Sequence, residues 1–470
     1  IWLEGVATDR PFGAQATLTA DVINSSFTLM APIADQDRFL GLLKDRLQLS
    51  PEKTDAGTYK VEVPVINEVH LRFANDYVYL GRTIKDVDPK SIPTPKAFFA
   101  NDDGAVGSVI VRIDQIPDEV KTFVIGQFEL GLNEQRRKNV KKESPVEKAA
   151  IDWMTENVSG ALKTFLDDAK ELRASVYIDD KTDNLSAELT LTAKSGTTLA
   201  KNIASLAGKT SIPAAIVGGK GAAVRLTVKA ELPAAAKKDL DKVVDAGIEA
   251  ALKDVPEDQK ALAERVLKTI APSLKSGAID AAVSFTPRAK GGYTLIVAGA
   301  VKKGNDIESL AKDLAKQFGP MIGEAVEFKF DVEKIGSFNL HQVTINAMPP
   351  DVQKVFGTNK VWVAASEDYI AVSIEPDGTA LRTGLKANPA PVPAFSLEVA
   401  GAQLVPLVAK NLNADEVKAV LKDTFGDESP AGKDTLSITA TGGDKLSVKG
   451  TLKGKVVRML TSFFMLRKQQ

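Results

Sequence analysis

The sequence predicts an α+β protein built of tandem repeats. Each repeat is expected to be a small antiparallel sheet covered by a two-helix hairpin, and the repeats to form an elongated or curved array. Two observations lead to this prediction. Segments of alternating apolar residues, typical of strands with one buried face, are interspersed with segments of helical periodicity. The same order of segments also returns at long intervals, which is the signature of internal repeats.

The junction between a strand and the helix after it occurs three times. Residues 109–113 lead to Pro117, residues 224–228 lead to Pro233, and a looser copy at 395–399 leads to Pro406. Proline suits the first turn of a helix because its missing N–H group has no intrahelical partner there. We therefore expect three strands that each open a repeat.

Similar elements follow the first two junctions. Each is followed by two segments of helical periodicity, two alternating segments and a short helix. Residues 106–205 and 221–318 are therefore predicted to share the order strand, two helices, two strands, helix.

A longer period divides the chain into long and short units. The hairpin completed by Tyr77 has a counterpart completed by Tyr369, and only the long units contain such a hairpin. The first long unit lacks an opening strand and helical hairpin, which predicts an open sheet edge near residues 15–33. The predicted divisions are a partial long unit at 1–105, a short unit at 106–220, a long unit with an additional β-hairpin at 221–393, and a C-terminal short unit at 394–470.

Composition limits the chemistry that the protein can perform. The absence of cysteine excludes disulfides, thiolate metal sites and cysteine nucleophiles. His70 and His341 are the only histidines, and both lie in alternating segments. We interpret them as structural residues that lie apart, without carboxylate partners in a common cleft. We therefore predict no catalytic residue, no cofactor and no metal.

The charge balance gives no reason to expect nucleic acid as a partner. The formal net charge is −1, whereas nucleic-acid binding requires a basic surplus. The basic run at 136–142 is interpreted as the solvated tip of a helical hairpin, with an acidic or phosphate-rich contact as the alternative. Residues 179–184 are interpreted as a hairpin turn in preference to a calcium loop, and 218–221 as a turn in preference to a phosphate loop.

The C-terminal segment carries more apolar surface than a short covering helix needs. One interpretation is that it covers the last unit; the alternatives are a partner groove or a membrane interface. The candidate partner-contact residues are Met459, Leu460, Phe463, Phe464 and Leu466.

Residues 112–117, the paired helical segments after them and residues 185–191 resemble secreted, internally repeated proteins of unknown function that are abundant in planctomycete bacteria. The resemblance covers most of the chain and implies export to the periplasm, the cell surface or the exterior. It implies no activity, cofactor or site residue. Residue 1 is Ile and no signal peptide is evident, so we expect a processed chain.

Three functions are compatible with these observations. The first is a non-enzymatic cell-envelope or extracellular protein that acts as a scaffold or assembly subunit, by self-association or by contact with other envelope proteins. The second is a binding protein for an apolar ligand held between sheet and helices. The third is a hydrolase that uses carboxylates alone. The sequence favours the first and leaves enzymatic activity undecided.

Overall fold

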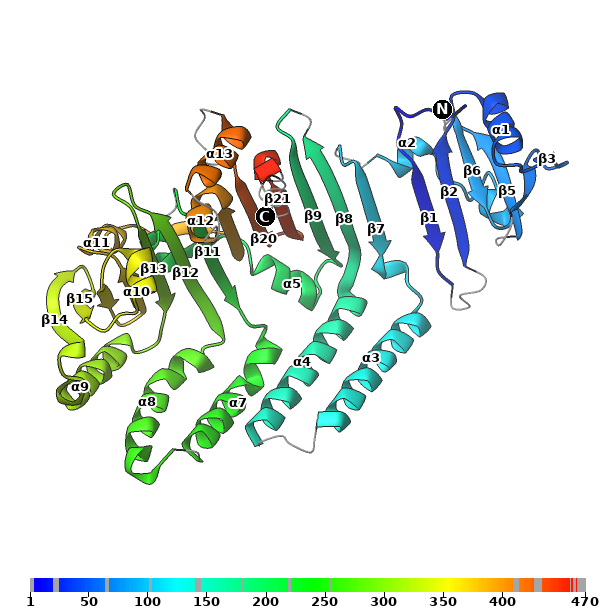
Figure 1. Cartoon of the computed structure of the whole chain (residues 1–470). Helices are drawn as coiled ribbons and strands as arrows, with labels where there is room; N and C mark the ends of the chain where they lie inside the picture. Colours follow the sequence, from blue (N-terminus) through cyan, green and yellow to red (C-terminus); the bar gives the residue numbers. More distant parts are fainter. Residues whose placement is uncertain are drawn as a thin grey trace. The chain divides into compact units, whose positions relative to one another are not determined.

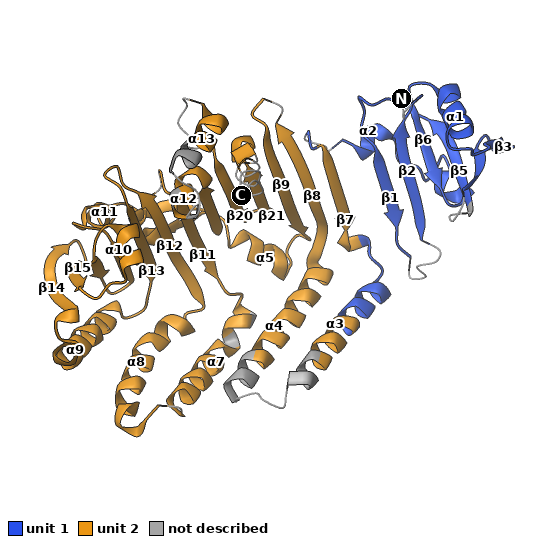
Figure 2. Cartoon of the chain, in the orientation of Figure 1, with its two compact units in different colours: residues 1–105, 115–126 blue, residues 106–114, 127–470 orange. Residues whose placement is uncertain are grey.

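The computed structural model confirms an α+β protein, with 39% helix, 35% strand and large antiparallel sheets. The chain divides into two compact units (Figure 2). Unit 1 contains residues 1–105 and 115–126, and unit 2 contains residues 106–114 and 127–470. The structure describes the chain except for residues 1–3, 20–24, 64–66, 101–103, 140–144, 180, 219–220, 254, 409–413, 427–432, 457, 460–461 and 463–470.

Unit 1 is a six-stranded antiparallel sheet with packed elements on both faces. Helix α1 (Gln36–Asp45), which Asp35 caps, packs Phe39 on one face. Tyr79 lies in a second core with the segment η2 (Ile84–Val87) and α2 (Pro95–Phe98). The strand order is β1 (Gly13–Thr17), β2 (Ser26–Pro32), β6 (Tyr77–Gly81), β5 (Asn67–Ala74), β4 (Tyr59–Val63) and β3 (Glu52–Lys53). The open edge expected near residues 15–33 is therefore β1, whereas β2 is an inner strand.

Unit 2 contains one continuous antiparallel sheet of thirteen strands (Figure 1). The small sheets predicted for residues 106–220, 221–393 and 394–470 are joined into this one sheet, because the edge strands of neighbouring segments pair with each other. The strand order is β14 (Val326–Ile335), β15 (Phe338–Ile345), β16 (Lys360–Ala365), β17 (Tyr369–Ile374), β13 (Tyr293–Ala300), β12 (Ala278–Pro287), β11 (Val224–Glu231), β19 (Phe395–Ala400), β20 (Thr435–Thr441), β21 (Leu446–Leu452), β9 (Asn184–Ala193), β8 (Ala169–Asp179) and β7 (Gly107–Arg112).

The order of elements follows the sequence prediction. Strand β7 precedes helices α3 (Asp118–Asn139) and α4 (Pro145–Asp168), then β8, β9 and α5 (Thr198–Ala204). Strand β11 precedes α7 (Ala234–Lys253) and α8 (Glu257–Lys275), then β12, β13 and α9 (Gly304–Ile322). Strand β19 likewise precedes α12 (Gly401–Val408) and α13 (Ala414–Phe425), then β20 and β21.

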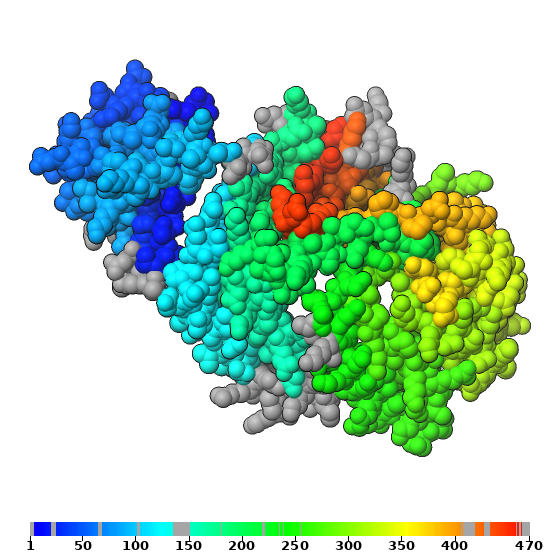
Figure 3. All heavy atoms as spheres, turned by 180° about the vertical axis from the view of Figure 1, so that it is seen from behind, coloured from blue at the N-terminus to red at the C-terminus, as the bar shows by residue number. Residues whose placement is uncertain are grey.

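The long helical hairpins do not cover the sheet as predicted. In unit 2, α4, α7 and α8 extend from one end of the strands (Figure 1). These helices pack against one another and not against the sheet. Trp153 of α4 donates a hydrogen bond from Nε1 to the carbonyl of Ala236 of α7, and Lys275 of α8 forms an ion pair with Asp245 of α7. A helix of about 20 residues is about 30 Å long, so these helices project far from the end of the sheet (Figure 1). In the space-filling view, openings pass through unit 2 among the green segments, so these segments form no closed layer (Figure 3).

Short elements cover one face of the unit 2 sheet instead. These include α6 (Ile212–Ile216), α11 (Thr379–Gly384) and the two-stranded ladder of β10 (Lys209–Ser211) and β18 (Ala390–Val392). The core beneath them contains Leu340 and Trp362 among small side chains such as Ala371. Small residues let the short helices approach the strands closely, so this face becomes the interior of unit 2.

Candidate functional site

In an ordinary amphipathic sheet the apolar face is covered and the polar face is exposed. In the unit 2 sheet the arrangement is reversed. On the covered face, hydroxyl side chains are buried, among them Ser175, Thr227, Ser284 and Ser373. The strand positions between them carry aliphatic side chains that remain partly or largely exposed. We call the side of the sheet that these aliphatic residues form the open face.

Rows of paired residues on the open face are apolar over eleven neighbouring strands. Cross-strand pairs place neighbours on the same face, so one row can be followed from β7 to β16. It consists of Gly107, Val176, Ala187, Gly450, Ile438, Leu397, Leu226, Val283, Val297, Val372 and Val363. The next residue in this row, on β15, is His341.

The open face is most exposed at β7, β8 and β9. Val109 is 66% exposed, Ile178 is 52% exposed and Leu189 is 43% exposed. A hollow of about 630 Å³ lies here, where Gly107, Ala187 and Gly450 replace larger side chains. Its apolar walls are Val109, Val176, Leu189, Ile438 and Val448. Contiguous exposed apolar surface is common at interaction sites, so this hollow is a candidate binding surface.

Polar pairs explain how the other face of these strands is buried. Ser447 donates to Glu188 at 2.7 Å, and Ser186 and Thr451 lie 3.2 Å apart at their hydroxyl oxygens. Asp280 accepts hydrogen bonds from Ser211 at 2.5 Å and from Lys229 at 2.6 Å. Because buried polar groups are stable when they are hydrogen-bonded, these pairs allow the polar side to face the short helices.

A second candidate site lies where the apolar row ends. The Nδ1 atom of buried His341 accepts a hydrogen bond of 3.0 Å from the backbone N–H of Asp331. Its Nε2 atom lies 3.3 Å from Oε1 of Glu308, without forming a hydrogen bond. The Lys312 ammonium contacts Glu308 at 2.7 Å and Asp331 at 2.8 Å. Asp331 has φ of 52° at the irregularity between Lys329 and Glu333, which turns its backbone toward His341.

These residues do not fit a metal ion in the arrangement shown. Glu308, Asp331 and His341 each place one ligand atom within 4.8 Å of the others. However, the ammonium of Lys312 already forms ion pairs with both carboxylates. Because Nδ1 accepts a hydrogen bond, the proton of the neutral ring is on Nε2, which then has no free lone pair to ligate a metal. The cluster is therefore an ion-pair network that joins α9, β14 and β15 around the buried side chains of His341 and Glu308.

His341 makes the stability of unit 2 depend on pH. Burial lowers the pKa of its imidazole, and the carboxylate of Glu308 only partly offsets this. The folded protein therefore favours the neutral ring, so stability is full above the ordinary histidine pKa of about 6.5 and falls as pH drops below it. We expect urea unfolding, followed by tryptophan fluorescence, to show a steeper loss of stability between about pH 7 and 5 than in a His341→Gln variant. Equal slopes would contradict the assignment.

His70 lies in unit 1, whereas His341 lies in unit 2. His70 is on β5, where its Nε2 atom lies 2.8 Å from Oε1 of Glu68. The pKa of Glu68 is lowered, chiefly by its hydrogen bond with Lys60. Each histidine nevertheless contacts a carboxylate of its own, because strand residues two apart share a face and α9 carries Glu308 onto His341. In each case the carboxylate contact ties the ring to neighbouring structure.

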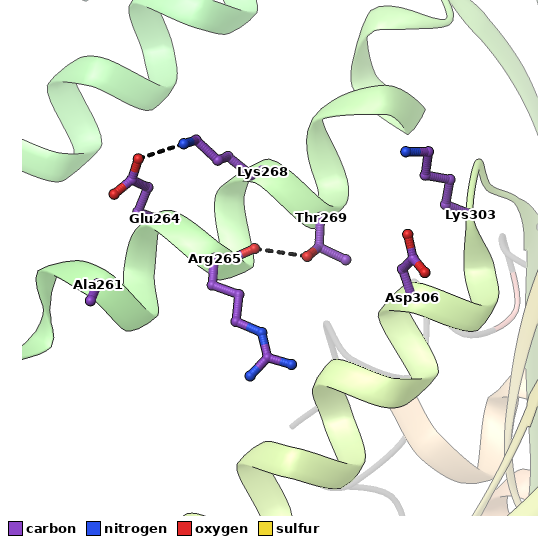
Figure 4. Close-up of a pocket in the computed structure, with 7 residues that line it drawn as sticks. All are labelled: Ala261, Glu264, Arg265, Lys268, Thr269, Lys303 and Asp306. Atoms are coloured by element: carbon purple, nitrogen blue, oxygen red, sulfur yellow. Dashed lines mark hydrogen bonds and ion pairs between the residues drawn. The ribbon is translucent and has the colours of Figure 1, made fainter.

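A polar hollow of about 430 Å³ lies between α8 and the start of α9 (Figure 4). Three of its five charged side chains, Glu264, Arg265 and Lys268, form ion pairs. Lys268 contacts Glu264 at 2.6 Å, which lowers the pKa of that carboxyl. Arg265 donates to Asp313 of α9 at 2.5 Å. We therefore interpret this hollow as an ion-paired groove between helices.

Among the described residues, two further sequence motifs belong to a turn and to the core. Asp179 accepts from the backbone N–H of Lys181 and from the hydroxyl of Thr182, in the turn between β8 and β9. Met459 is buried against α12 and α13, with Val405, Val420 and Phe425, so its side chain contributes to the core of unit 2. The other candidate partner-contact residues, Leu460, Phe463, Phe464 and Leu466, lie outside the described residues.

Sequence reasoning missed the open face. Its signal was present in residues 185–191, where leucines alternate with polar residues, but alternation does not say which side is covered. None of the helices that the structure describes combines the length and hydropathy needed to cross a membrane. No protein-family model, curated protein or solved structure matches the chain.

Proposed function

We propose that this protein binds an elongated apolar ligand with an acyl-type hydrocarbon chain on the open face of unit 2. The observation that carries the proposal is the apolar hollow at β7–β9, with rows of apolar side chains leading from it across the sheet. Its volume of about 630 Å³ lies within the range of small-molecule sites. It is a form of the second function compatible with the sequence, but the ligand lies on an open sheet face and not between sheet and helices.

The chemistry of the open face favours hydrocarbon over a protein surface. The row from Gly107 on β7 to Val363 on β16 contains no polar side chain, and backbone N–H and C=O groups inside a sheet are used in the ladder. Protein interfaces normally include about one hydrogen bond per 100–200 Å². A hydrocarbon chain needs no such partner, and each buried methylene contributes about 0.8 kcal/mol.

The ion-pair network around His341 does not support the hydrolase alternative. A pair of catalytic carboxylates needs environments that push their pKa values apart. Here Lys312 contacts both Glu308 and Asp331. The assembly function remains a separate proposal.

We expect cis-parinaric acid to gain fluorescence on binding, and hexadecanoate to displace it. A Leu189→Asp substitution places a charge in the hollow and is expected to weaken binding at least about tenfold, equivalent to 1.4 kcal/mol. The matched control is Ile84→Asp in unit 1, because Ile84 is 44% exposed, like Leu189, and lies outside the open face. Absence of binding by the unmodified protein, or equal binding by both variants, would refute the proposal.

A further inference from the structure

Three strands of unit 2 occupy equivalent places in the order of elements. Strands β7, β11 and β19 each precede two helices and then two strands that pair with each other, and we call them the leading strands. On one edge, each pairs with the first strand after its two helices: β7 with β8, β11 with β12, and β19 with β20. This is the inner edge of a leading strand.

The outer edges of two leading strands pair with each other. Strands β11 and β19 are antiparallel, and Leu226 lies opposite Leu397, with Val224 opposite Val399. The junction keeps apolar residues together on the open face. Within this chain, the outer edge of one leading strand therefore forms a stable antiparallel pair with the outer edge of another.

Strand β7 is the remaining leading strand, and its outer edge is free. It ends the thirteen-strand order, and within the described residues no strand pairs with that edge. All its residues, 107–112, are exposed. The strand has few of the devices that normally block an edge: it contains no proline or lysine, its pairing with β8 runs without a bulge, and its one charged residue, Arg112, is at its end.

We propose that β7 pairs antiparallel with β7 of a second copy of this chain. An antiparallel pair of identical edges has a two-fold axis, so one surface serves as both partners. The pair repeats the arrangement of β11 with β19, and Val109 and Val111 then continue the open face across the junction.

Strand β1 is a poorer partner by the same comparison. The order β1, β2, β6, β5, β4, β3 of unit 1 parallels the order β12, β13, β17, β16, β15, β14 of unit 2. Strand β1 thus corresponds to β12, which pairs with the inner edge of β11. By this comparison β1 would pair with the inner edge of a leading strand. The inner edge of β7 is already occupied by β8.

The absence of cysteine allows a direct test. A two-fold axis perpendicular to the sheet keeps every residue on its own face, so only one residue of β7 lies opposite its own copy. Directly opposed Cα atoms, about 4.5–5.5 Å apart, suit a disulfide. Among single Ser108→Cys, Val109→Cys, Ile110→Cys and Val111→Cys variants, we expect one to form a disulfide-linked dimer efficiently on mild oxidation. Equal cross-linking at all four positions, or at none, would overturn the proposal.

A blocked edge provides the second measurement. Analytical ultracentrifugation of the unmodified chain is expected to show a dimer, and Val109→Lys is expected to weaken it at least about tenfold because lysine blocks edges. Val297→Lys is the matched control, since Val297 is also exposed on the open face but lies on the inner strand β13. A chain that stays monomeric at every concentration would overturn the proposal. This includes a monomer in which another strand of the same chain pairs with the outer edge of β7. So would a dimer that Val109→Lys leaves intact.

Discussion

Replacing Gly384 with alanine is expected to destabilise unit 2 by about 3 kcal/mol, the upper part of the range for overpacking. Gly384 ends α11, where it meets the backbone of Ile216 in α6, and a methyl group would overlap the Ile216 carbonyl oxygen. Because the obstacle is backbone, the two short helices must separate. Urea unfolding measured by circular dichroism would show the loss as a lower midpoint.

Gly160→Ala is the matched control. Gly160 lies inside α4, and nothing lies within 4 Å of the position that its Cβ would take. Alanine favours a helix interior over glycine by up to about 1 kcal/mol, so a small gain in stability is expected. The same change in the urea midpoint for both substitutions would contradict the close approach of α6 and α11.

Asp280→Ala is expected to cost about 3 kcal/mol, because it removes one partner from a buried ion pair. The carboxylate of Asp280 is buried and holds both Lys229 and Ser211. Ser211 also accepts the backbone N–H of Ala214, which caps α6. Loss of the carboxylate therefore leaves the Lys229 ammonium without its ion-pair partner. It also leaves Ser211, the N-cap of α6, without the acceptor that orients its hydroxyl.

Two further variants separate burial from charge. Adding Lys229→Met to Asp280→Ala should recover part of the stability, since neither charge is then left alone. Glu264→Ala removes an exposed pair with Lys268 on α8 and should leave the urea midpoint unchanged. A comparable loss from Asp280→Ala and Glu264→Ala would contradict the assigned role of burial.

The sequence by itself determined the local elements. Alternation in residues 185–191 and 224–228 predicted strands, now β9 and β11, and helical periodicity predicted the long hairpins α3–α4 and α7–α8. These patterns depend on neighbours two to four residues apart, which the sequence shows directly. The resemblance to planctomycete repeat proteins and the export that it implies remain predictions.

Only the tertiary structure decided which edges meet and which face is covered. Strand β9 pairs with β21, and β11 pairs with β19, across long stretches of chain that local periodicity does not record. Alternation in β9 shows that its two faces differ, yet the covered face carries Thr190 and the open face Leu189. The physical reason is that burial depends on whether the polar side finds partners, as Glu188 does in Ser447, and these partners come from distant strands.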